Sequence, residues 1–198
     1  QFLTWADYVV SHAGPVLALC PLAVAGQIKR EADAIGVDVT ICRSQADVPS
    51  RGIAVANYEM LSHFDASAFA GVVLDESSII KSYTGKTKTA ILSAFERTKY
   101  KLACTATPSP NDLLELLNQA EFLGVLNSHE AIARWFTNTD KAGKYRLRHW
   151  ARDAFWDWVT SWARCLSKPS DIGFSDDGFI LPGLRREQHV LSVDVVRD

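Results

Sequence analysis

The sequence lacks several features that would assign it to a class at once. No apolar run approaches the roughly 18–20 residues that a membrane-spanning helix needs, and no signal peptide is visible, so we expect a cytoplasmic protein with no membrane partner. The four cysteines include no close pair with metal-ligand spacing, which favours reduced thiols over a zinc site. The formal net charge is only −2, so a nucleic-acid partner would have to be held by local basic patches.

What the sequence does contain is a buried-strand pattern that ends in two carboxylates. In GVVLDESS, residues 71–78, small and apolar residues run directly into Asp75 and Glu76. A second such run, KLACTATP, ends in Thr105 and Thr107. Parallel strands that are buried on both faces deliver polar residues to the open end of the sheet. We therefore expect the carboxylates to face an open crevice, with the threonine-bearing strand as their neighbour.

Strand and helix patterns alternate along the first part of the chain. The predicted strands are residues 16–20, 38–42, 52–58, 71–76 and 100–106. The predicted helices are residues 1–13, 23–35, 86–97 and 112–123, the last capped by Asn111 and the second burying Val24, Ile28, Ala32 and Ile35. This alternation predicts an α/β fold, a parallel sheet with helices on both faces.

After Gly124 the pattern changes. Residues 129–137 and 149–166 have helical spacing, and residues 168–183 are rich in Pro, Gly, Ser and Asp, which is typical of a linker. Residues 187–195 have the pattern of a strand. We therefore expect an α/β domain over residues 1–126, a helical appendage over 127–167, and over 168–198 a linker and strand that lead toward a second domain.

The carboxylate pair suits the hydrolysis of a phosphoanhydride. That reaction needs a magnesium ion near the phosphates and a base aimed at a water molecule. Magnesium keeps most of its own waters, so Asp75 alone could hold it through that water shell, while Glu76 polarises the attacking water. The two residues by themselves also fit the solvated start of a loop, and this alternative stays open.

The order of the motifs resembles the first motor domain of superfamily-two helicases and translocases, in the Swi/Snf-like branch found in phage and bacteria. ALCPLAVAGQIKREA is similar to motif Ia of that family, AVANYEML to motif Ib, LDESS to motif II (the Walker B or DEAD/DEAH-like box), and LACTATPSPND to motif III. FILPGLRRE resembles the segment that leads toward the second motor domain. In motif III, Ala106 replaces the usual glycine.

The resemblance implies an ATPase, with ATP and magnesium as cofactors and nucleic acid, double-stranded DNA in particular, as partner. It implies that Asp75 and Glu76 are catalytic and that Thr105 and Thr107 couple the nucleotide site to the nucleic-acid site. An ST-turn that leads into Pro108 would also explain the threonines. The resemblance further implies that the motif Ia and Ib loops contact phosphates, through Pro21, Leu22, Asn57 and Tyr58.

One element of the family is not found. The sequence contains no GxxxxGK[ST] phosphate-binding loop. Gly85-Lys86-Thr87 matches only the end of that pattern, because the first glycine would fall on Ile80, and a solvated helix start explains these residues better. We expect the first strand and the phosphate loop of the RecA-like fold to lie before Gln1, so that this fragment alone would be inactive.

Two further points stay open. Lys29 and Arg30 fit phosphate contacts and a solvated helix face equally well, whereas the basic run KAGKYRLRHWAR, residues 141–152, fits a solvated helix end better than a nucleic-acid patch. The resulting prediction is the first motor domain of an ATP-dependent DNA helicase or translocase, whose second RecA-like domain supplies an arginine finger. The alternative is a degenerate motor domain that binds nucleic acid or protein without catalysis.

Overall fold

The computed structural model describes residues 2–81, 85–109, 111–139 and 144–189. By its internal contacts the chain divides into two units, residues 1–156 and residues 157–198. The first unit contains the whole sheet and every strand of the described residues.

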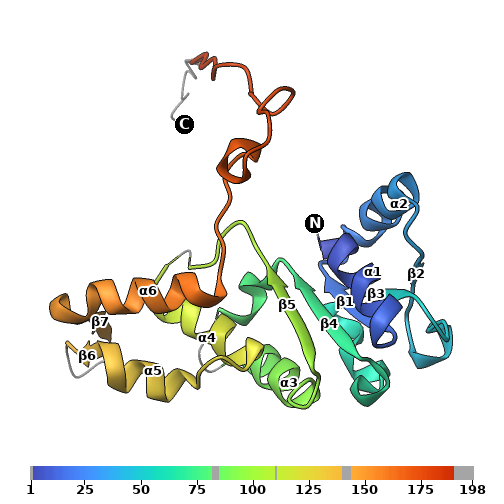
Figure 1. Cartoon of the computed structure of the whole chain (residues 1–198), viewed down its shortest axis with the longest axis horizontal. Coiled ribbons are helices and arrows are strands. Elements are labelled where there is room, and N and C mark those ends of the chain that lie inside the picture. The colour runs from blue at the N-terminus through green and yellow to red at the C-terminus, as the bar shows by residue number, and fades with distance from the viewer. Residues whose placement is uncertain (1, 82–84, 110, 140–143, 190–198) are drawn as a thin grey trace, which may run out of the picture. The chain divides into compact units, whose positions relative to one another are not determined.

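The first unit is built on a five-stranded parallel sheet (Figure 1). Its strands, in the order in which they lie side by side, are β2 (Val39–Ile41), β3 (Ile53–Asn57), β1 (Val16–Cys20), β4 (Gly71–Asp75) and β5 (Tyr100–Cys104). All four pairings are parallel. The apolar runs of the sequence therefore form the parallel sheet that was predicted, with β1 at its centre.

Helices cover both faces of this sheet, because alternate residues of each strand face opposite layers. Val16, Ala18 and Cys20 of β1 pack in one cluster with α1 (Phe2–His12) and α2 (Ala25–Ile35). Leu17 and Leu19 pack in the other cluster, with α3 (Lys86–Ala94) and α4 (Leu114–Leu123). The predicted fold class, an α/β domain with helices on both faces, is confirmed.

The start of β4 depends on a glycine. A Cβ atom at Gly71 would lie 3.1 Å from Val9 Cγ1 of α1 and 3.2 Å from Val16 Cγ2 of β1. Such contacts are tighter than most packed Cβ atoms make, so the absent side chain helps α1 to lie close to the sheet. This close packing fixes where β4 begins and therefore where its carboxylates are delivered.

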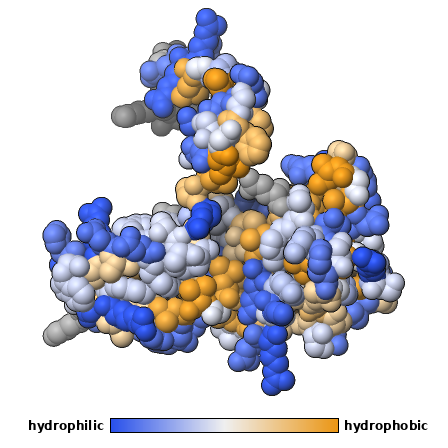
Figure 2. Space-filling view, viewed as in Figure 1, coloured by the Kyte–Doolittle hydropathy of each residue, from blue (hydrophilic) through white to orange (hydrophobic). Residues whose placement is uncertain are grey.

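Two details of the predicted helices differ in the structure. Ile35, expected on the buried face of α2, is 57% exposed, and Figure 2 shows hydrophobic surface over this helix. Leu113, not Asn111, occupies the N-cap position of α4, and Asp112 Oδ1 accepts the N–H of Leu114 instead. Sequence spacing alone could not show either difference, because α2 is not covered along its last turn and two polar residues precede α4.

The segment after α4 contains a hairpin as well as helices. Helix α5 (Ser128–Trp135) is capped by Asn127 and is followed by β6 (Phe136–Asn138) and β7 (Tyr145–Leu147), which pair antiparallel. A 3-10 turn, His149–Ala151, then leads into α6 (Arg152–Trp162). The helix expected over 129–137 therefore ends two residues earlier, and that expected over 149–166 begins as a 3-10 turn and ends at Trp162.

The second unit has little regular structure among its described residues. Besides the end of α6 it contains one 3-10 turn, Pro169–Ile172. Of the strand expected over residues 187–195, residues 187–189 are not in a strand and residues 190–195 lie outside the described residues. No helix of the described residues is long and apolar enough to cross a membrane.

Candidate functional site

The strand-end residues of the motifs gather at one edge of the sheet, because all its strands run in the same direction. Asp75 is paired with Cys104, the residue before Thr105, and Cys20, the residue before Pro21, is paired with Asn57. The motif segments of β1, β3, β4 and β5 thus share the carboxyl edge. This edge is where ligands bind in open α/β sheets.

Glu76 adopts a backbone conformation that is unusual for its residue type. Its φ is +53°, and it is the one non-glycine residue with positive φ among those the structure describes. A left-handed conformation costs a residue with a Cβ atom about 1–2 kcal/mol. Such strain persists where the surroundings impose it, and it is concentrated at functional sites.

The carboxylate of Asp75 is half-buried and lies near two other negative charges, those of Glu76 and Glu31. Burial raises its pKa above the ordinary value, and the neighbouring charge of Glu76 raises it further, while the N–H of Glu76 opposes this. Glu31 of α2 raises the pKa slightly as well. No lysine or arginine pairs with Asp75 in the described part of the chain.

This arrangement fits a magnesium ion. An unpaired, half-buried carboxylate beside a second carboxylate is stabilised when a cation binds, and magnesium takes few protein ligands. No three His, Cys, Asp or Glu side chains of the described residues cluster as a metal site. Asp75 is the residue here that could hold such an ion, directly or through water.

Thr105 links the end of β5 to Glu76. Its hydroxyl lies 3.5 Å from Glu76 Oε2, at the long limit of a hydrogen bond, and also accepts the N–H of Thr107 at 3.0 Å. The second bond is the ST-turn considered in the sequence. Thr105 therefore has the turn geometry and also contacts a predicted catalytic carboxylate, whereas the side chain of Thr107 is exposed.

Tyr58 supports the site from inside the domain. Only 7% of this residue is exposed, and its hydroxyl donates to the carbonyl oxygen of Asp75 at 2.7 Å. Its side chain therefore does not face a nucleic acid as expected, because it fills the core beneath the end of β4. Burial, with the nearby charge of Asp75, raises the pKa of Tyr58 far above its usual value, so the phenol stays a hydrogen-bond donor.

Two amide side chains of α4 hold the loop that follows Glu76. Asn118, fully buried, donates through Nδ2 to the carbonyl oxygens of Ile80 and Lys81 at 2.9 and 2.8 Å. Gln119 Nε2 donates to the carbonyl oxygen of Ser77 at 3.2 Å. These bonds fix the 3-10 turn Ser77–Ile80 and thereby help to impose the conformation of Glu76. Sequence analysis missed this role, although two adjacent amides within a Leu-rich helix were its signal.

A buried ion pair completes this support. Lys88 of α3 lies 2.7 Å from Glu121 Oε2 and donates to Asn118 Oδ1 at 2.9 Å. Burial alone would raise the pKa of Glu121, but hydrogen bonds from Lys88 and Ser128 outweigh it and lower that pKa. The cluster joins α3, α4 and α5 behind the site.

The remaining predicted nucleic-acid contacts vary in accessibility. Leu22 is 75% exposed at the carboxyl edge, and Pro21 and Asn57 are half-buried there. Lys29 pairs with Asp33 one turn along α2, as a solvated helix face does. Gly85 precedes the first turn of α3, which agrees with the expected helix start.

Arg148, in the basic run, has a structural partner. Its guanidinium donates to the carbonyl oxygens of Ala133 and Arg134, both at 3.0 Å. These carbonyls belong to the last turn of α5, where intrahelical donors are lacking. Arg148 therefore ties the hairpin to α5, and residues 141–143 of the run lie outside the described residues.

Comparison with known proteins supports the fold. No protein-family model and no curated protein matches the chain. Among solved structures, the SWI2/SNF2 ATPase core of Sulfolobus solfataricus in complex with dsDNA is similar, with 20% sequence identity and a TM-score of 0.59. The match covers 74% of this chain and 32% of that one, so the chain spans about a third of that structure. The parallel sheet and its flanking helices therefore form a RecA-like α/β fold of the kind seen in a SWI2/SNF2 ATPase core.

Proposed function

We propose that the chain is part of the first motor domain of an ATP-dependent DNA helicase or translocase, in which ATP hydrolysis drives movement on nucleic acid. The observation that supports this best is the meeting of Asp75, Glu76 and Thr105 at the carboxyl edge of a RecA-like sheet. The similar ATPase core was solved with dsDNA, which supports double-stranded DNA as the partner.

In this proposal each strand-end residue has one task. Asp75 holds magnesium, which when bound neutralises charge on the phosphates. Glu76 orients a water molecule and accepts its proton, and its backbone conformation sets the direction of its carboxylate. Thr105, in contact with Glu76, passes changes at the nucleotide to the neighbouring loops, with Thr107 beside it.

The full-length protein has to provide what this sequence lacks. No GxxxxGK[ST] loop occurs in the chain, so the proposal requires a phosphate-binding loop from another part of the full-length protein. A second RecA-like domain would supply an arginine finger. The exposed loop at Leu22, with Pro21 and Asn57, would contact the DNA backbone, which positions a motor without reading sequence.

The test is ATP hydrolysis by the full-length protein with and without duplex DNA. Glu76→Gln should lower the DNA-stimulated rate by about 10²–10⁴-fold, the usual contribution of a positioned general base. The matched control is Glu96→Gln, because Glu96 is exposed and precedes β5 at the opposite edge of the sheet.

Equal hydrolysis by Glu76→Gln and the unchanged protein would refute the role of Glu76. DNA binding without any ATP hydrolysis would instead support the non-catalytic alternative, a degenerate motor domain that acts as a binding module.

A further inference from the structure

A second candidate site lies among β7, the start of α6 and the residue before α4. A pocket of about 520 Å³ opens there, within the size range of small-molecule sites. None of the strand-end residues of the first site lines it. Its walls come mostly from the hairpin and helix region, where the sequence favoured a solvated helix end over a nucleic-acid patch.

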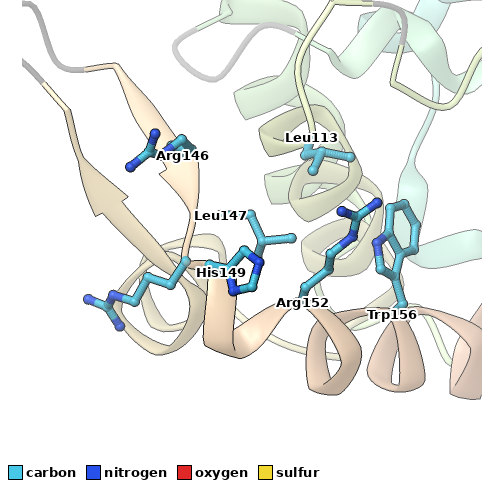
Figure 3. Close-up of a pocket in the computed structure, with 7 residues that line it drawn as sticks. Leu113, Arg146, Leu147, His149, Arg152 and Trp156 are labelled. Atoms are coloured by element: carbon cyan, nitrogen blue, oxygen red, sulfur yellow. The ribbon is translucent and has the colours of Figure 1, made fainter.

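The pocket combines apolar walls with three arginines, a histidine and an indole. Figure 3 shows the side chains of Leu113, Leu147, His149 and Arg152 turned toward a common space beside Trp156, whereas Arg146 points away from it. Arg152 and Trp156 are four residues apart on α6, so they lie on the same helix face.

Arg152 is available to bind an anion. The described residues give its exposed guanidinium no hydrogen bond or ion pair, in contrast to Arg148, which is bound to α5. Residues 144–156 contain four arginines and lysines and one acidic residue, Asp153, although the whole chain has a net charge of −2. The pocket therefore lies in a locally positive region.

The same region exposes two indoles. Trp156 is 38% exposed and Trp150 is 75% exposed, with the guanidinium of Arg148 5.8 Å from the Trp150 ring centre. Exposed aromatic rings among cations are the surfaces on which unpaired bases stack. Stacking contributes little dependence on sequence, because every base has an aromatic face.

We propose that this pocket binds one unpaired nucleotide of a single-stranded nucleic acid. The base lies against Trp156 and the two leucines, and its phosphate pairs with Arg152. A strand fits better than a free nucleotide, because Arg146 and Trp150 extend the basic and aromatic surface beyond the pocket. The inference rests on the proposed function for its class of partner and adds a single-strand site outside the strand-end motifs.

The test measures binding by the full-length protein to a fluorescein-labelled oligo-dT strand, by anisotropy and without ATP. Trp156→Ala should weaken binding about five-fold or more, and Trp156→Phe should restore most of it. Arg152→Gln should reduce the slope of log K against log salt by about 0.7, the value for one phosphate contact on a single strand. Arg97→Gln is the matched control, since Arg97 is exposed and outside this pocket.

Trp156 contacts the buried Phe155, with ring centres 5.4 Å apart, so circular dichroism has to show that its variants fold. Arg152→Gln removes no hydrogen bond or ion pair of the described residues and tests the proposal independently. Affinity within two-fold of the unchanged protein and an unchanged salt slope in both variants would overturn it. Equal competition by free dTMP, at the concentration of nucleotide in the strand, would also overturn it.

Because this assay contains no ATP, its failure differs from failure of the proposed function. If the Trp156 and Arg152 variants bind the strand as the unchanged protein does, while Glu76→Gln lowers ATP hydrolysis, only the pocket proposal is refuted. If Glu76→Gln leaves hydrolysis unchanged, while the Trp156 and Arg152 variants bind the strand more weakly, only the catalytic proposal is refuted.

Discussion

Replacing Asn118 by leucine tests whether α4 holds the loop after Glu76. Leucine has nearly the same shape but cannot donate to the carbonyl oxygens of Ile80 and Lys81 or accept from Lys88. A net hydrogen bond contributes about 0.5–1.5 kcal/mol, and a buried group left without a partner costs about 1–3 kcal/mol. Because Lys88 keeps Glu121, we expect a loss of about 2–4 kcal/mol in the free energy of unfolding.

Urea unfolding followed by circular dichroism measures this loss as a lower midpoint at unchanged slope. Gln27→Leu is the control, because Gln27 makes only an exposed bond to Glu31 within α2, for which about 0.2–0.5 kcal/mol is expected. The reasoning is refuted if Asn118→Leu loses less than about 0.5 kcal/mol. If Asn118→Leu were destabilised but kept full DNA-stimulated hydrolysis in the full-length protein, the claim that Asn118 supports the position of Glu76 would also be refuted.

Four further predictions follow from the same contacts. Glu76→Gly should raise the free energy of unfolding by up to about 1 kcal/mol, because glycine adopts the left-handed conformation without strain; an unchanged or lower urea midpoint would contradict this. Asp75→Asn should raise the melting temperature without magnesium, because it removes a half-buried charge beside Glu76, and should abolish any rise on adding magnesium. Arg148→Gln should lower the free energy of unfolding by about 1–2 kcal/mol and speed hydrogen exchange in α5, since two carbonyl oxygens lose their donor. The pKa of Glu121 is lowered from 4.5 on folding, so the stabilisation that this carboxylate gives is present above pH 4.5 and is lost as the pH falls below that value. In urea titrations, the difference in free energy of unfolding between Glu121→Gln and the unchanged protein should therefore become smaller below pH 4.5.

The sheet could be predicted from the sequence because each strand is a continuous apolar run. Runs such as Val16–Cys20 and Gly71–Asp75 are buried on both faces, as strands of parallel sheets are. Their direction then placed Asp75 and Thr105 on neighbouring strand ends, which the structure confirms. The catalytic roles of these residues stay predictions.

Side-chain direction could not be predicted in the same way. Tyr58 follows an apolar strand directly, and the pattern does not say whether an aromatic residue there turns toward the core or a ligand. It turns inward, onto the carbonyl oxygen of Asp75. The polar contacts of Asn118 escaped notice for a related reason, since helical spacing identifies an apolar face and says nothing of buried amides.

The hairpin was missed because its strands are short. β6 and β7 have three residues each, too few for an alternating pattern to stand out, and the second lies in a basic run. Arg148 was interpreted through its charge, whereas its contacts are with backbone carbonyl oxygens that only the folded hairpin brings near.

Alternation along β4 has a consequence for how this sheet could diverge. Val73 packs on the α1 and α2 side, and Val72 and Leu74 pack on the other, so Asp75 leaves the strand on the side of Val73. Inserting one residue before Asp75 would invert this order, pointing the carboxylate at the opposite layer while most side chains stayed apolar. Inserting two residues would restore it. Whether the number of residues before Asp75 is odd or even therefore decides the side on which the carboxylate lies, more than which apolar residues they are.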